Sequence, residues 1–267
     1  APPSRSGPTQ WPVAPFEPHP LLRNRHLQTL AGVCFGRGTT SAEGTIQHRV
    51  ALPDGDQLVV HDDRPPRWEP PDPVTVLLHG LCGSANSPYM SRIAAKLNAR
   101  GLRTFRVDMR GAGAGRGLAK HAYHAGRSED LAAVIDSVRA VCPRSAIALA
   151  GFSLGGNILL KWLGEQADAA TPAVTRAIAV NPPVDLQLCT DHISTVGGSF
   201  YDRYFARLLY RHVCETPHWW DTRPAEWSAR RPRRLLEFDE QFTAPRSGFA
   251  SAADYYQRSS AARVIAH

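Results

Sequence analysis

A serine between two glycines is the feature of the chain that most clearly indicates chemistry. Residues 151–155 read Gly-Phe-Ser-Leu-Gly, a G-x-S-x-G pattern, and follow an apolar run, residues 146–150, that is typical of a buried parallel strand. Apolar residues recur at helical spacing from Gly155 onward, so the chain passes directly from strand to helix. At such a turn glycines let two backbones approach, and Ser153 is exposed at the positive end of a helix. An acyl-transferring nucleophile requires this placement.

The pentapeptide alone leaves an ordinary strand–turn–helix corner open as a second interpretation, because glycine and serine are common in turns. A phosphate-binding loop is excluded. Gly151 and Gly156 have the separation of G-x-x-x-x-G-K-[ST], but Asn157 stands where the lysine is required. The glycine-rich run after Asp108 does not fit a dinucleotide-binding loop, since Arg116 stands at the position of the third glycine.

A second glycine-containing segment supplies candidate backbone donors. Residues 79–83, His-Gly-Leu-Cys-Gly, follow an apolar strand expected over residues 74–78. In a serine hydrolase such a loop and the residue after the nucleophile together form the oxyanion hole. We therefore assign this role to the N–H groups of Leu81 and Leu154, with Cys82 as the alternative first donor. The histidine that opens the segment is interpreted as structural, because it ends a strand.

Composition limits the class of protein. The chain has 267 residues, 43% hydrophobic and 21% charged, which suits one globular core. The net charge of +7 is carried almost wholly by arginine, and no nucleic-acid docking element accompanies it. The five cysteines have no metal-ligand or disulfide-framework spacing, so we expect no metal site and a reducing compartment. No apolar run is long enough for a membrane span, and we expect a cytoplasmic protein. The oligomeric state is left open.

Strands alternating with helices organise the rest of the chain. The proline-rich residues 1–20 predict an extended arm, and residues 45–61 predict a hairpin. Further strands are expected over residues 74–78, 102–108, 146–150 and 174–180, with helices between them. This order predicts a doubly wound, mostly parallel sheet whose ligands bind at the carboxyl ends of its strands. His79, Asp108 and Ser153 should therefore converge on one crevice.

Several segments resemble one known family. They are residues 25–29, 79–83, 123–126, 151–157, 181–186, 238–245 and 254–256. In this order they resemble the α/β hydrolases of the bacterial YheT-like and eukaryotic ABHD1/ABHD3-type (AB hydrolase 4) family. The resemblance implies an α/β-hydrolase domain over residues 21–267 with a helical lid inserted at about 187–250. It also implies a serine esterase or lipase that acts without a cofactor on small-molecule or lipid esters, and some relatives transfer the acyl group to an alcohol.

The expected lid contains an aromatic stripe and a run of arginines. Phe200, Tyr204, Leu208 and Leu209 fall on one helical face and three tryptophans follow, at positions 219, 220 and 227. We expect this stripe to form the underside of the lid, where part of it would line an acyl pocket. The basic run, residues 230–234, has two readings that stay open: contact with anionic headgroups or phosphate, or a solvated face.

The family pattern breaks at the end of the chain. The resemblance places the triad acid after the next strand and the histidine after the one beyond, whereas the chain ends at His267, before both. The stand-ins are Asp185, which the family uses structurally, and His192, His212, His218 and His267; we nominate none of them as acid or base. With the C-terminal strands missing, we expect residues 174–180 to have an unpaired side. We also expect the chain to be a weak enzyme, or a non-catalytic binding module of hydrolase fold.

Overall fold

The computed structural model describes residues 15–34, 44–166, 173–195 and 199–265. The chain divides into two compact units, Ala1–Arg37 and Gly38–His267. The first holds η1 (Pro20–Leu22) and α1 (Arg25–Cys34). Most of the expected N-terminal arm, residues 1–14, lies outside the described residues. The second unit contains the sheet and the serine.

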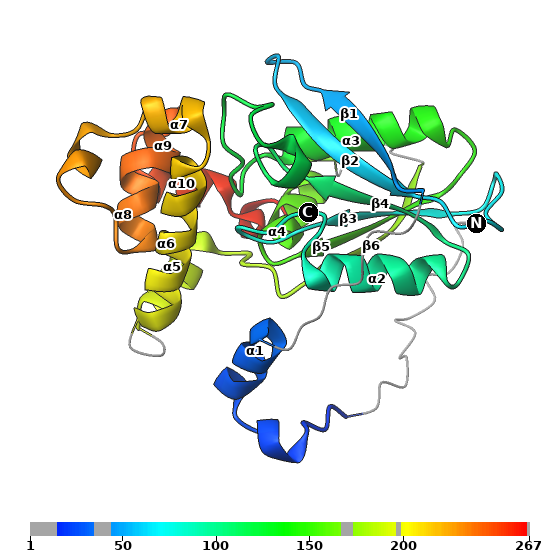
Figure 1. Cartoon of the computed structure of the whole chain (residues 1–267), viewed down its shortest axis with the longest axis horizontal. Coiled ribbons are helices and arrows are strands. Elements are labelled where there is room, and N and C mark those ends of the chain that lie inside the picture. Colours follow the sequence, from blue (N-terminus) through cyan, green and yellow to red (C-terminus); the bar gives the residue numbers. More distant parts are fainter. Residues whose placement is uncertain (1–14, 35–43, 167–172, 196–198, 266–267) are drawn as a thin grey trace, which may run out of the picture. The chain divides into compact units, whose positions relative to one another are not determined.

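Six strands form one mixed sheet in the order β1-β2-β4-β3-β5-β6 (Figure 1). They are β1 (Ile46–Ala51), β2 (Gln57–Asp63), β3 (Val74–Leu78), β4 (Arg103–Asp108), β5 (Ile147–Phe152) and β6 (Val174–Val180). β1 and β2 form the expected antiparallel hairpin, and β2 also pairs antiparallel with β4. The other pairings, β4 with β3, β3 with β5 and β5 with β6, are parallel. The predicted mostly parallel α/β sheet is thus confirmed.

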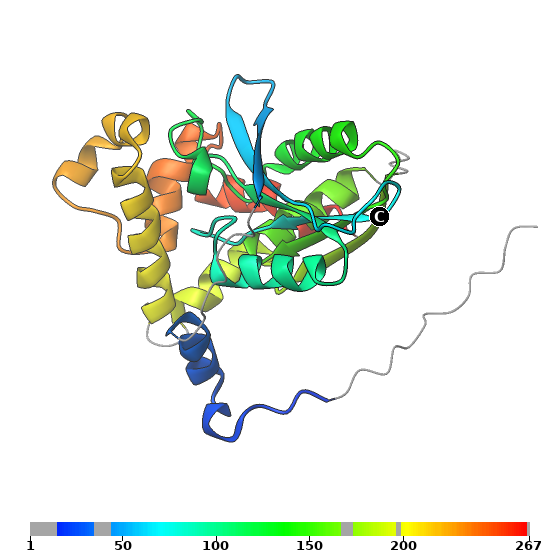
Figure 2. The ribbon, with the colours of Figure 1, turned by 45° about the vertical axis from the view of Figure 1, so that its right-hand side comes forward.

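Helices cover both faces of this sheet. α2 (Pro88–Asn98) lies on one face, and α3 (Ser128–Val141) and α4 (Leu154–Glu165) lie together on the other (Figures 1 and 2). Buried apolar side chains of β3 and β4 fill the space between these layers, since every residue of both strands is buried. α3 starts at Ser128, whose hydroxyl donates to Glu165 of α4 at 2.5 Å.

A group of helices beyond the sheet, the helical segment, occupies residues 186–246 at the left of Figure 1. Its helices are α5 (Leu186–Thr195), α6 (Phe200–Cys214), α7 (Pro217–Asp221), α8 (Leu235–Phe238) and α9 (Ala244–Arg246), and α10 (Ala252–Ser259) follows. Val213, Trp219, Trp227, Phe238 and Phe242 form a small core of its own. No described helix is long and apolar enough to cross a membrane.

β6 forms one edge of the sheet. Among the described residues it pairs only with β5, so the backbone groups on its outer side make no ladder. Most of its side chains are exposed, including Ile178 at 62%. An exposed, partly apolar edge strand can pair with another chain.

Two glycines allow β5 to turn into α4. A Cβ on Gly151 would lie 2.5 Å from the carbonyl oxygen of Gly155, on the first turn of the helix. A Cβ on Gly155 would lie 2.5 Å from the carbonyl oxygen of His79 and 2.8 Å from that of Leu78. The expected close contact at Gly155 therefore exists, and its partner is the end of the neighbouring strand β3. Backbone atoms cannot give way as a flexible side chain can, so the position accepts no Cβ.

We expect Gly155→Ala to lower the free energy of unfolding by about 2 kcal/mol or more, because its methyl group would overlap two carbonyl oxygens. Gly115→Ala is the matched control, since a Cβ there meets nothing nearer than 3.7 Å. Denaturant unfolding of both variants measures the difference. Equal stability of the Gly155→Ala variant and the parent chain would contradict the tight α4–β3 contact.

Candidate active site

Ser153 sits in a strained conformation between β5 and α4. Its φ of 51° and ψ of −118° place it in a region that non-glycine residues seldom occupy. Its N–H donates to the carbonyl of Val180 at 2.9 Å, and its own carbonyl accepts from Gly156 and Asn157 in the first turn of α4. Bonds on both sides therefore hold the serine in this conformation, at the N-terminus of the helix.

Two tyrosine hydroxyls hold the loop that follows β3. The N–H of Gly80 donates to Tyr89 at 2.9 Å, and the N–H of Cys82 donates to Tyr123 at 2.7 Å. Between them the N–H of Leu81 has no hydrogen-bond partner within the described residues, and neither does that of Leu154. Both residues line the same cavity as Ser153. The geometry thus leaves the two predicted donors free, while Cys82, the alternative, has its N–H occupied.

Sequence analysis did not identify the two tyrosines that hold this loop. Tyr123 belongs to a segment that matched the family, which could have drawn attention to it, whereas nothing in the sequence distinguishes Tyr89. The loop also lies against the serine: a Cβ on Gly80 would be 3.1 Å from the Cβ of Ser153. Only the folded chain shows that these hydroxyls and this glycine act on the same few backbone atoms.

Buried charged groups anchor the far end of the same loop. The carboxylate of Asp108, at the end of β4, accepts from His61 at 2.8 Å, from the N–H of Ala85 at 2.6 Å and from the N–H of Ala114 at 2.9 Å. Burial opposes its ionisation, but these hydrogen bonds hold the pKa of Asp108 below its ordinary value. Arg106 donates to the carbonyl of Ala85 at 2.7 Å. Asp108 therefore positions the loop, but neither Asp108 nor His79 lines the cavity that Ser153 enters, so the predicted convergence of the three side chains on one crevice is not found.

Neither the histidine nor the cysteine of the loop is suited to catalysis. His79 is fully buried, with Nδ1 bonded to the carbonyl of Gly80 at 2.7 Å and Nε2 accepting from the N–H of Met109 at 3.2 Å. Both ring nitrogens are thus engaged, and burial lowers the pKa of His79. Burial raises the pKa of the Cys82 thiol to about 12, so it stays protonated at neutral pH.

Ser153 opens into a cavity of about 360 Å³ between the sheet and the helical segment. Most of its lining is apolar. It includes Leu186 and Ile193 of α5, Phe205 and Leu209 of α6, Trp219 of α7 and Phe242. Such a volume and lining suit an acyl chain.

The predicted aromatic stripe is correct only in part. Leu209 and Trp219 line the cavity as expected. Phe200 and Tyr204 point elsewhere, since they are 55% and 40% exposed, and Trp227 packs in the core of the helical segment. The face of α6 that meets the cavity carries Leu209, as predicted, together with Phe205, which the predicted stripe did not include.

Two histidines line the cavity with Ser153, and neither is nominated as the base. His124 accepts from the N–H of Gly126 at 3.1 Å, and His212 of α6 bonds to the carbonyl of Gly111 at 2.7 Å. Burial lowers the pKa of both rings. Within the described residues no hydrogen bond joins the Ser153 hydroxyl to an imidazole or a carboxylate.

The remaining stand-ins lie away from the serine or outside the described residues. Asp185 is exposed, and its carboxylate accepts from the N–H of Leu188 in the first turn of α5, which is a structural role. His192 and His218 are exposed and do not line the cavity. His267 lies outside the described residues.

One carboxyl group lines the cavity. Asp239 accepts from the hydroxyl of Thr243 at 2.7 Å and from that of Tyr256 at 2.7 Å. Burial raises the pKa of Asp239 to about 6, and the two hydroxyls reduce the shift only in part. The helical segment thus places an ionisable group whose pKa is raised to about 6 in a mostly apolar wall.

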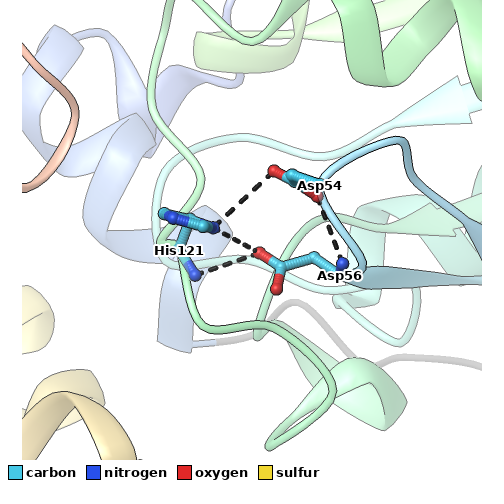
Figure 3. A group of neighbouring side chains, drawn as sticks. All are labelled: Asp54, Asp56 and His121. Atoms are coloured by element: carbon cyan, nitrogen blue, oxygen red, sulfur yellow. Dashed lines mark hydrogen bonds and ion pairs between the residues drawn. The ribbon is translucent and has the colours of Figure 1, made fainter.

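A second cluster has the donor atoms of a cation site but is already charge-compensated. Asp54, Asp56 and His121 bring one ligand atom each within 4.8 Å of the others (Figure 3). The guanidinium of Arg110 donates to Asp54 at 2.5 Å and to Asp56 at 2.7 Å, and it also pairs with Asp130 of α3. We interpret the cluster as a clamp that ties the β1–β2 turn to the loop after β4.

The chain is similar to a protein-family model, to curated proteins and to solved structures. The family model Hydrolase_4, described as "Serine aminopeptidase, S33", matches residues 69–239, more than half of the chain. "Putative esterase YheT" of Escherichia coli is 30% identical over 94% of this chain and 74% of its own length. "Monoacylglycerol lipase" of Saccharomyces cerevisiae is 26% identical over 72% of this chain, which spans 44% of that protein. An α/β serine hydrolase homologue from Coxiella burnetii has 29% identity and a TM-score of 0.43 over 55% of this chain and 66% of its own.

The buried carboxyl of Asp239 predicts a pH dependence of stability. Its folded pKa of about 6 lies above the ordinary 3.8, so the folded chain binds the proton more tightly than the unfolded chain. The resulting stabilisation is fully present below pH 3.8 and is lost as the pH rises through about 6. We expect Asp239→Asn to remove up to about 3 kcal/mol of this dependence.

Urea unfolding at pH 4.5 and pH 7.5 tests this expectation. The stability of the parent chain relative to the Asp239→Asn variant should be greater at the lower pH. Asp136→Asn is the control, because its side chain is 77% exposed and should show no such difference. An equal gap between parent and Asp239→Asn at both pH values would contradict the raised pKa.

Proposed function

Since the chain belongs to the Hydrolase_4 family of α/β hydrolases, we propose that it is a serine carboxylic-ester hydrolase of the esterase or lipase type. One observation carries the proposal. Ser153 sits in a strained strand–helix turn and opens into an apolar cavity beside two backbone N–H groups, those of Leu81 and Leu154. This combination offers a nucleophile, a place for developing negative charge and room for an acyl chain.

In the proposed reaction, the Ser153 hydroxyl oxygen attacks the ester carbonyl and forms a tetrahedral intermediate. Its oxyanion accepts hydrogen bonds from the N–H groups of Leu81, in the loop held by the bonds of Gly80 and Cys82 to tyrosines, and of Leu154, the first residue of α4. The carbon–oxygen bond to the alcohol then breaks, and the alcohol leaves with the serine proton. Water attacks the acyl-enzyme, which releases the carboxylic acid and restores the serine.

The helical segment would act as the lid predicted at about residues 187–250. Its apolar side chains Phe205, Leu209 and Trp219 face the cavity that Ser153 enters. We propose that they bind the acyl chain, because burial of methylene groups contributes roughly 0.8 kcal/mol each. This lining favours an acyl ester over the peptide substrate that the family description names, since a peptide needs more polar partners.

Two alternatives differ from this proposal in testable ways. A binding module of hydrolase fold would use the same cavity without covalent chemistry. It is favoured by the Ser153 hydroxyl, which has no imidazole partner among the described residues. Acyl transfer to an alcohol shares the first half-reaction and differs only in the acceptor, so products formed with and without added alcohol separate it from hydrolysis.

Ester turnover and covalent labelling by a fluorophosphonate should both depend on Ser153. Where an acid and a base are available to Ser153, we expect Ser153→Ala to lower turnover of a p-nitrophenyl ester by roughly 10⁴ to 10⁶, because a triad nucleophile contributes that much, and we expect it to abolish labelling in any form of the protein. Ser194→Ala is the control, since its hydroxyl is exposed on α5 and bonds only locally to the carbonyl of Asp191. Mass spectrometry of the labelled chain identifies the modified residue.

The result also separates the alternatives. Labelling at a residue other than Ser153, or ester turnover that survives Ser153→Ala in a clean preparation, would contradict the proposed nucleophile. A parent chain that is neither labelled nor active, yet binds a fluorescent fatty acid in the cavity, would identify the binding module instead.

A further inference from the structure

A basic hollow lies on the outer surface of the helical segment. Part of α6 and the non-helical stretch before α8 line a space of about 510 Å³. Its charged lining consists of Glu237 and six arginines, and the arginines are here called the arginine surface: Arg203, Arg207, Arg230, Arg231, Arg233 and Arg234. All six are exposed. Folding therefore places two arginines of α6 beside the arginines of residues 230–234.

Few carboxylates compensate these charges. Glu237 lies 3.6 Å from Arg230, and the buried Asp202 lies 3.9 Å from Arg234. Among the described residues, the other four guanidinium groups form no ion pair. A concentration of unpaired positive charge on one side of a protein attracts an anionic partner over about one Debye length, roughly 8 Å at physiological salt.

Apolar side chains adjoin the arginines on the same surface. Phe200, Arg203, Tyr204 and Arg207 lie at positions i, i+3, i+4 and i+7 of α6, which places them on one face of the helix. The rings of Phe200 and Tyr204 stack at 6.4 Å with an interplanar angle of 11°, although both are substantially exposed. Leu236, just after the arginine run, is 48% exposed.

We propose that the arginine surface, with Phe200, Tyr204 and Leu236, binds the headgroup region of an anionic lipid bilayer. Arginines would pair with lipid phosphates, and the aromatic and aliphatic side chains would enter the boundary between headgroups and acyl chains. A soluble phosphate compound would leave the exposed apolar side chains unused. A nucleic acid would need a docking element that the described helices do not form. The proposal does not depend on Ser153 being catalytic.

Cosedimentation of the chain with vesicles tests this proposal. Phosphatidylcholine vesicles are compared with vesicles that also contain phosphatidylglycerol, at low and at physiological salt. The test variant carries R203Q, R207Q, R231Q and R233Q, which removes the four unpaired guanidinium groups and leaves no carboxylate without its partner. The control variant carries R49Q, R92Q, R144Q and R176Q, which removes four exposed arginines from other elements.

We expect the parent and the control to bind anionic vesicles well above neutral ones, with weaker binding at higher salt. The test variant should lose at least about tenfold in partition coefficient, since each basic residue near such a surface contributes about fivefold. Tyr204→Ala should lose a smaller factor that salt does not change. Circular dichroism and unfolding midpoints confirm that all variants fold.

Three results would overturn the proposal. They are equal binding to neutral and anionic vesicles, an equal loss in the test and control variants, and binding of a soluble polyanion through these arginines without binding to anionic vesicles.

Discussion

The approach of α4 to the end of β3 is the contact on which the candidate site depends. Gly155 leaves room for the carbonyl oxygens of Leu78 and His79, where any Cβ would be 2.5 to 2.9 Å from strand atoms. Because the helix can come this near, Ser153 and the loop after β3 lie within van der Waals distance. The strained conformation of Ser153 is held by backbone bonds on both sides, which is how strained residues persist at functional sites.

Polar groups buried beneath the loops hold the rest of the site. Asp108 and Arg106 fasten the loop after β3, while Arg110 joins the β1–β2 turn to α3. Asn157 of α4 donates to the carbonyls of Ala125 and Ser259 and accepts from the N–H of Ala261. Each buried group has several partners, which offsets the cost of taking it out of water. Loops without regular secondary structure are thereby fixed relative to the sheet.

The helix α6 has two faces with different environments. Phe205, Leu209 and Val213 face the cavity that Ser153 enters, and Phe200 with Arg203 and Arg207 faces outward. Helical periodicity separates the two sets, since residues three or four apart share a face. If both proposals hold, one helix would contact the acyl chain of a substrate on its inner side and a lipid surface on its outer side. The two functions could then be altered independently.

The sequence alone determined the strands, the mostly parallel α/β sheet class and the serine turn, because these depend on local patterns. Apolar runs, glycine spacing and G-x-S-x-G each need only a few adjacent residues. It could not determine which face of α6 meets the cavity, nor that Tyr89 and Tyr123 hold the loop, since these contacts join residues that are distant in the sequence, 41 positions apart for Cys82 and Tyr123. Nor could it show that Arg203 and Arg207 meet the run at 230–234. Such contacts arise from the packing of distant segments, and no local pattern records them.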